Sequence, residues 1–214
     1  MALVRLTRLA DAGGNAGQPI RAAATVILWR SGANGAQILM GQRGAAAAFM
    51  PSKYVFPGGA VDAEDQHNAS GALAERCVAR LALHCAPDAP SAAVLAAAAL
   101  RELHEETGLR PAPDAEMRFV FRAITPPGRS RRFDARFFLV SSVGIKGDAT
   151  GFSDASDELS HLHWIGLSEA RALDLPFITE VVLAEVTALL AGLDQPGVPF
   201  FDNSTDVPTF RRLA

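Results

Sequence analysis

Three glutamates lie close together in the stretch LRELHEETGL, residues 100–109. Glu102, Glu105 and Glu106 stand at i, i+3 and i+4, so a helix would project all three carboxylates from one face. Clustered carboxylates repel one another, and hard divalent cations such as Mg²⁺ prefer oxygen ligands and often bridge carboxylates to substrate phosphates. The spacing indicates either a metal site or a solvated helix face on which Arg101 pairs with Glu105.

A second stretch upstream, VFPGGAVDAED at residues 55–65, turns sharply and then becomes acidic. Two glycines end an apolar run, and Asp65 closes the acidic segment that follows. A hairpin turn alone would explain Gly58 and Gly59, because glycine tolerates backbone conformations that other residues avoid. The stretch indicates a function only when it is considered together with the three glutamates.

The surrounding pattern predicts strands mixed with helices in one chain. Ser91 can cap a long helix over 92–107, and Gly108 can end it. An amphipathic helix is expected within 71–85, with Leu73, Val78 and Leu81 near one face. Further strands are expected at 22–30, 37–43, 54–56, 118–125, 133–141 and 161–166, and further helices at 168–173 and 178–192. This order favours an α/β fold with a mixed sheet covered on both faces, in a single domain over 1–214.

Composition excludes several classes of protein. Hydrophobic residues make up 49% and charged residues 20% of the 214, which is typical of a globular chain. A net charge of -3 does not indicate a nucleic-acid or membrane surface, and the longest uncharged apolar run is too short to span a bilayer. Cys77 and Cys85 fit neither a disulfide framework nor a zinc site. We expect free thiols and a cytoplasmic protein.

Read together, the two stretches resemble the Nudix box. The second stretch matches at every defined position, from Arg101 to Leu109. The first keeps Gly59 with an acid six positions on, although Asp65 stands where the family usually has glutamate. Thirty-five residues separate Asp65 from Arg101, where the family pattern has seven, so 28 are additional. The box is therefore split by an insert, approximately residues 66–93.

The resemblance implies an α/β/α sandwich that hydrolyses a diphosphate linked to another moiety with Mg²⁺ or Mn²⁺. The family pattern makes the Gly58 carbonyl and the carboxylates of Glu102, Glu105 and Glu106 the metal ligands. It gives Glu105 a catalytic role, with Arg101 holding it in place. The general base comes either from the box, here Glu102, or from a later loop, where Glu158 is the candidate. A solvated loop carboxylate is an equally good interpretation of Glu158.

Residues 22–176 also resemble the peroxisomal coenzyme A diphosphatase branch, through FMPSKYVFPGG, the insert and RRFDARFFLV. That branch cleaves coenzyme A or its thioesters to phosphopantetheine and 3′,5′-ADP. A related coenzyme A pattern keeps Leu39 and Arg43 but has Ala48 and Ser52 where it expects Arg and Gly. Guanidinium groups suit phosphate oxygens, although each could equally be a surface charge. The expected phosphate contacts are Arg43, Arg129, Arg131, Arg132 and Arg136.

Two alternatives remain open. The substrate could be ADP-ribose, a dinucleotide or a nucleotide sugar, or the chain could be a non-catalytic nucleotide-binding module. The intact set of three glutamates argues against the module, because degenerate Nudix modules tend to lose these acids. The expected partner is a small-molecule diphosphate, without nucleic acid or membrane. The insert is expected either to cover the substrate cleft or to meet a second copy of the chain in a homodimer, through Leu73, Val78 and Leu81. A decorative surface helix is the alternative.

Overall fold

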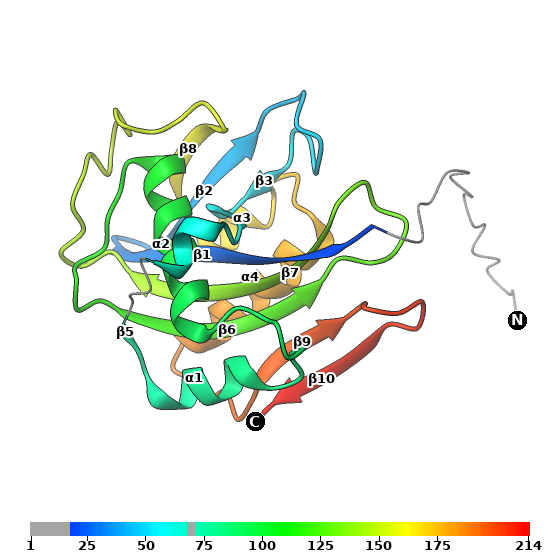
Figure 1. The fold of residues 1–214 in the computed structure, drawn as a ribbon. Helices are drawn as coiled ribbons and strands as arrows, with labels where there is room; N and C mark the ends of the chain where they lie inside the picture. Colours follow the sequence, from blue (N-terminus) through cyan, green and yellow to red (C-terminus); the bar gives the residue numbers. More distant parts are fainter. Residues whose placement is uncertain (1–17, 68–71) are drawn as a thin grey trace, which may run out of the picture.

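The computed structural model describes residues 18–67 and 72–214, which form a mixed sheet with helices on both faces (Figure 1). The strands follow the order β10-β9-β6-β7-β1-β2-β3, with β4 paired to β1, β5 to β6 and β8 to β2. The β1–β7, β6–β9 and β5–β6 pairs are parallel, and the remaining pairs are antiparallel. The α/β class and the mixed sheet expected from the sequence are confirmed.

The strands have the following bounds: β1 Ile20–Gly32, β2 Gly35–Arg43, β3 Tyr54–Val55, β4 Gly58–Ala60, β5 Ala72–Leu73, β6 Glu116–Ile124, β7 Arg132–Ser141, β8 Leu159–Gly166, β9 Val198–Asp202 and β10 Thr209–Leu213. β1 is the central strand and is apolar on both sides. Val26 and Leu28 belong to the core under α2, whereas Ile27 belongs to the core under α4. Because successive side chains point to opposite faces, the continuous apolar run of β1 suits a strand covered twice.

Two long helices cover the sheet. α2 (Ala92–Thr107) crosses the front in Figure 1, and α4 (Phe177–Leu190) lies behind. α2 begins and ends as expected, because Ser91 Oγ accepts a hydrogen bond from the Val94 N–H at 3.3 Å and Gly108 is left-handed with φ 72°. The shorter helices are η1 (Ala63–Gln66), α1 (Glu75–Ala82) and α3 (Leu167–Ala170). No helix among the described residues is long and apolar enough to cross a membrane.

The insert forms part of the core instead of a separate layer. Within 71–85, where a helix is expected, only Glu75–Ala82 among the described residues are helical, as α1. Strand β5 precedes this helix and pairs with β6. Leu81 is buried and Leu73 packs against the same core, while Val78 stays 43% exposed. In Figure 1, α1 lies at the lower edge of the sheet, away from the glutamate end of α2. Leu81 therefore serves the fold, and Leu73 packs against the core while remaining partly exposed.

A C-terminal hairpin extends the sheet beyond β6 and was not expected from the sequence. β9 pairs in parallel with β6 through Phe200 and Phe201, and β10 pairs antiparallel with β9. Proline at position 199 and polar residues around 202–206 hide the strand pattern. Phe200 is 1% exposed and belongs to the core under α2, so tertiary packing decides the strand.

Candidate active site

The glutamate end of α2 lies directly over the glycines of β4. Gly58 and Gly59 pair with Thr25 and Ala24 of β1, which fixes β4 under the helix. A Cβ on Gly59 would overlap the Glu102 carboxylate, and one on Gly58 would lie 2.5 Å from the Ala24 carbonyl oxygen. Only glycine permits this approach of backbone to carboxylate. The two stretches of the split pattern therefore meet in space.

Arg101 joins the two halves of the box. Its Nε and Nη2 donate to the two carboxylate oxygens of Asp65 at 2.9 and 3.1 Å, and Nη2 also donates to the Ala60 carbonyl at 3.0 Å. Its Nη1 donates to Glu102 Oε1 and Glu105 Oε2, both at 2.9 Å. One guanidinium thus orients carboxylates from η1 and from α2. Arg101 is a positioning residue in this arrangement.

Asp65 is well suited to this contact. It is 2% exposed, and η1 presents it at the end of a one-turn helix beside α2. Burial alone raises the pKa of Asp65, but hydrogen bonds from Arg101 and from the Asp62 N–H outweigh it and hold that pKa below its usual value. The shorter aspartate in place of the family glutamate therefore still forms a bidentate pair with Arg101.

Glu106 is as deeply buried as Asp65. Its Oε2 accepts a hydrogen bond from the Gly58 N–H at 2.8 Å, and the residue is 2% exposed. Burial raises the pKa of Glu106 to about 8; the Gly58 hydrogen bond opposes this rise, while the charges of Glu102 and Glu158 add to it. Burial likewise raises the pKa of Glu102, against the opposing effect of Arg101. Clustered buried acids of this kind favour either a proton or a cation.

Arg43 and Glu158 lie near the three glutamates. Arg43 ends β2 opposite Leu159, the residue that follows Glu158, and its charge lowers the pKa of Glu106. The negative charge of Glu158 raises the pKa of Glu102 and of Glu106. Arg43 Nε is buried and has no hydrogen-bond partner among the described residues. A cation and an additional acid therefore flank the three glutamates.

The donor set has the oxygen chemistry that divalent cations prefer. Within residues 18–67 and 72–214, no three acidic, histidine or cysteine side chains stand together in metal-binding geometry. The reason is visible in the contacts, since Arg101 draws Glu102 and Glu105 to its Nη1 and Glu106 faces the Gly58 N–H. The oxygen-only donors and the glycine floor under Glu102 nevertheless match what Mg²⁺ or Mn²⁺ requires.

The other four predicted arginines are not at this site in the way expected. Arg132 is buried, and its Nε and Nη2 donate to the backbone carbonyls of Thr125 and Asn203. Arg136 is 1% exposed and forms an ion pair with Asp134 at 3.0 Å. Arg129 and Arg131 are exposed in the loop before β7. Alternation along β7 turns Arg132 inward, so RRFDAR does not form one continuous phosphate-binding face.

Sequence reasoning missed an ion pair between a buried arginine and a partly buried aspartate. Arg122 lies in the middle of β6, is 3% exposed, and forms a bidentate pair with Asp134 of β7 at 2.7 and 2.8 Å. The available signal was a charge inside the apolar stretch RFVFRAIT, because a buried charge is retained only with a partner or a function. The partner, Asp134, could be identified only once the β6–β7 register was known.

Comparisons with known proteins agree with this geometry. Residues 90–186 match the family model described as NUDIX domain. A solved NUDIX hydrolase from Alicyclobacillus acidocaldarius is similar at 25% identity and a TM-score of 0.58, covering 83% of this chain and 98% of that chain. The NUDIX domain of Shewanella oneidensis NrtR, complexed with ADP ribose, is 14% identical with a TM-score of 0.52, covering 85% and 96%. The comparison with curated proteins found no significant match.

The family match begins at residue 90, near the end of the insert, so it includes RELHEETGL and leaves out the glycine stretch. The contacts of Arg101 with Asp65 and Ala60 connect that glycine stretch to α2 in the structure. A MutT protein from Methanosarcina mazei shares the fold at 16% identity and a TM-score of 0.51, covering 80% of this chain and 96% of that chain. The chain is therefore similar to the NUDIX domain model over residues 90–186, and its fold is similar to that of solved Nudix proteins over most of its length.

Proposed function

We propose that the chain is a metal-dependent diphosphatase that cleaves the diphosphate of a nucleoside diphosphate derivative. The observation that supports this most directly is the Arg101 arrangement, in which one guanidinium places Asp65, Glu102 and Glu105 around the glycine loop. A solvated helix face would not need Gly59 to make room for Glu102. Nor would it bury Glu106 against the Gly58 N–H.

Each residue has a distinct task in this proposal. Glu102, Glu105, Glu106 and the Gly58 carbonyl would hold Mg²⁺ or Mn²⁺, which supplies charge neutralisation for the diphosphate and a more acidic water. Arg101 fixes the ligands, and the Arg43 guanidinium, whose charge acts on Glu106, would contact a phosphate oxygen. Glu158 or Glu102 accepts the proton of the attacking water. The bond between phosphorus and the bridging oxygen breaks, leaving two phosphate monoesters.

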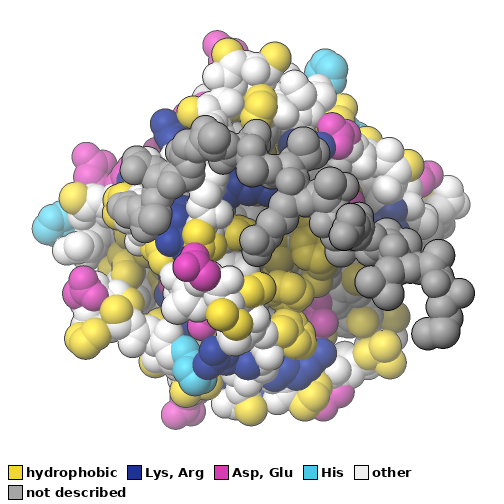
Figure 2. All heavy atoms as spheres, turned by 90° about the vertical axis from the view of Figure 1, so that its right-hand side faces the viewer, with side chains coloured by type: hydrophobic (Ala, Val, Ile, Leu, Met, Phe, Trp, Pro, Cys, Tyr) yellow, Lys and Arg dark blue, Asp and Glu magenta, His cyan; other side chains and the backbone are white. Residues whose placement is uncertain are grey.

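Within this class we propose coenzyme A or a short acyl-coenzyme A as the substrate. The exposed Arg129 and Arg131 lie in a loop that reaches residues 44–50, because Ser130 Oγ donates to the Ala48 carbonyl at 3.0 Å and Phe49 packs edge-on against Phe133. Figure 2 shows hydrophobic side chains in a hollow on this side of the molecule, with Lys and Arg side chains below it. A pantetheine arm and a phosphate would suit such a surface.

A substrate panel with a coupled phosphatase tests the proposal. Activity on a diphosphate should be absent with chelator and should return with Mg²⁺ or Mn²⁺. Coenzyme A should yield 3′,5′-ADP and phosphopantetheine by chromatography. Hydrolysis that continues in chelator would contradict metal dependence. Cleavage of ADP-ribose without cleavage of coenzyme A would reject the coenzyme A substrate and keep the diphosphatase.

A further inference from the structure

A cleft separate from the glutamate site lies between strands β6 and β7 and the loop that ends the insert. Its volume is about 530 Å³, within the range of roughly 300–1,000 Å³ typical of small-molecule sites. Its floor includes Arg122, Asp134 and Arg136 from β6 and β7, and its wall includes His84, Ala86 and residues 88–90. We call these residues together the arginine cleft. None of them belongs to the glutamate site.

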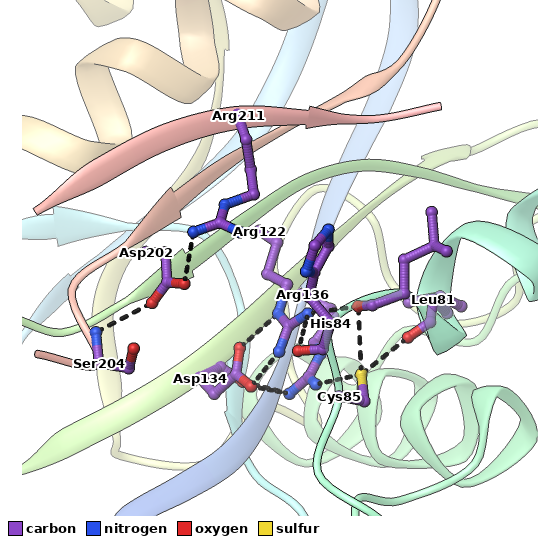
Figure 3. A network of polar contacts seen from close by, with 10 residues as sticks. Leu81, His84, Cys85, Arg122, Asp134, Arg136, Asp202, Ser204 and Arg211 are labelled. Atoms are coloured by element: carbon purple, nitrogen blue, oxygen red, sulfur yellow. Dashed lines mark hydrogen bonds and ion pairs between the residues drawn. The ribbon is translucent and has the colours of Figure 1, made fainter.

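Two guanidinium groups share one carboxylate on this floor (Figure 3). All three nitrogens of the Arg122 guanidinium form hydrogen bonds, because Nε and Nη2 donate to Asp134 and Nη1 donates to the Leu83 carbonyl at 2.9 Å. The hydrogen bonding of Arg136 is incomplete. Its Nη1 contacts Asp134, its Nη2 has only the Cys85 sulfur at 3.6 Å, and its Nε is buried with no partner in the described part of the chain.

The neighbouring charged residues do not neutralise the excess positive charge of the two arginines over Asp134. Asp202 also lines the cleft, but Arg211 contacts it at 3.3 Å. Arg21 at the rim pairs with Asp62 at 3.7 Å, and Asp88 is exposed on the loop. Among the described residues, the buried floor therefore carries two positive charges and one negative charge.

Burying an unmatched charge costs free energy, and Arg136 is the residue on which this cost falls. Burial lowers the pKa of Arg136 despite the nearby Asp134, and the charge of Arg122 lowers it further. A guanidinium has five N–H donors in a planar fork, and Arg136 lines the cleft, so an oxyanion bound there would supply negative charge and acceptors that Asp134 alone does not provide.

We propose that the arginine cleft is a binding subsite for a phosphate monoester, with Arg136 as its anchor and the end of the insert as its wall. The cleft lies beside the glutamate site, since Ala24 separates Arg136 from Gly59 across the β7–β1–β4 pairs. A terminal phosphate on the substrate, separate from the diphosphate, would fit this position. This assignment to substrate rests on the proposed diphosphatase function, whereas phosphate binding itself does not.

Cys85 provides a readout that needs no catalysis. Its sulfur lies beside Arg136, whereas Cys77 is 2% exposed and serves as an internal reference. Alkylation by N-ethylmaleimide would be followed by mass spectrometry in chelator, with inorganic phosphate or chloride at equal pH and ionic strength. We expect roughly 20 mM phosphate to slow Cys85 alkylation at least about threefold, as majority occupancy by a weakly bound anion requires. Broadening of the phosphate ³¹P resonance gives the same comparison if Cys85 resists the reagent.

Two variants on the exposed loop test the site without disturbing the buried network. Ala89→Glu adds a carboxylate to the cleft wall and should abolish the protection, whereas Asp88→Asn removes one and should strengthen it. Ala82→Glu and Asp114→Asn are the matched controls, because both are exposed and neither lines the cleft. Protection that is absent in the unmodified protein, or unchanged in both loop variants, would overturn the proposal.

Kinetics then identify the source of the phosphate. If the group belongs to the substrate, Ala89→Glu should raise KM for coenzyme A and leave dephospho-coenzyme A unchanged. Inorganic phosphate should then compete only with the former. If inorganic phosphate instead changes both substrates equally, the subsite stands and its assignment to substrate is wrong. A chain that hydrolyses no diphosphate would still show or lack Cys85 protection, so the two proposals fail separately.

Discussion

The glutamate site and the arginine cleft are opposite in charge and similar in construction. At the first, Arg101 stands among Asp65, Glu102 and Glu105, and buried Glu106 lies beyond it. At the second, Asp134 stands between Arg122 and Arg136. In both, one charge organises an excess of the opposite sign, so each is completed by a ligand: a cation at one and an oxyanion at the other. The following predictions, from the largest effect to the smallest, test that comparison.

Glu106 should make the metal-free protein less stable as pH rises. Its folded-state pKa is raised to about 8, so its stabilising protonation is fully present below the unfolded value near 4.5 and is lost as pH rises through 8. The free energy of unfolding in chelator should fall by up to about 4 kcal/mol between about pH 5 and 8.5. Urea denaturation would measure this fall. Glu106→Gln should flatten the slope, and an unchanged slope in that variant would assign it to other groups.

Glu105→Gln should reduce catalysis without unfolding the protein. Glu105 is half exposed and keeps its shape as glutamine, but it loses the charge that a metal ligand supplies. We expect kcat to fall at least about 100-fold, equivalent to about 2.7 kcal/mol. Steady-state kinetics with Mg²⁺ in excess would show this, with the exposed Glu116→Gln as the matched control. Full activity in Glu105→Gln would remove this residue from the ligand set.

Asp65→Asn should loosen the joint between the two halves of the box. The variant loses a buried charge-assisted pair with Arg101, and we expect the free energy of unfolding to fall by about 1.5–3 kcal/mol. Neighbouring Asp62 also faces Arg101, at 3.9 Å, but it is 58% exposed. Asp62→Asn should therefore cost under about 0.5 kcal/mol. Equal losses in the two variants, measured by urea denaturation, would show that burial does not set the strength of this joint.

Arg211→Gln should have the smallest effect on stability. The Arg211–Asp202 pair lies at the rim of the arginine cleft and is partly exposed, so its loss should cost under about 1 kcal/mol. The variant leaves Asp202 without its cation, however, and this should weaken phosphate protection of Cys85. Alkylation rates in phosphate and chloride would show the difference. Unchanged protection would mean that Asp202 does not oppose anion binding.

The two sites also differ in how far the sequence reveals them. The glutamate site was predictable because Arg101 to Glu106 lie within one helical turn and a half, where spacing alone sets the shared face. The insert did not prevent this prediction, since Gly58 and Gly59 identify the first stretch of the split Nudix box. The arginine cleft joins residues 84–90 to Arg122 and Arg136, and only the sheet register brings these together.

The same contrast applies to the fold. Apolar runs and caps predicted β1, β2, β6, β7 and α2 because those signals are local. β9 and β10 follow from packing against β6, and β4 follows from pairing of a glycine pair with β1, which no local pattern announces. The contacts of Arg132 were unpredictable for a related reason, since only the three-dimensional structure shows that its Nε and Nη2 donate to backbone carbonyls.

The central place of β1 has a consequence for how the chain is made. β1 pairs early partners, β2 and β4, on one side, but its other edge pairs with β7, about 110 residues later (Ile20 with Arg132). During synthesis from the N-terminus, the apolar β1 edge therefore stays open until residues 132–141 emerge, and such edges promote aggregation. Chains truncated at residue 131 should be insoluble and protease-sensitive, whereas those that end after α4 should resist both. Soluble, protected chains ending at 131 would show that the nascent edge is covered in another way.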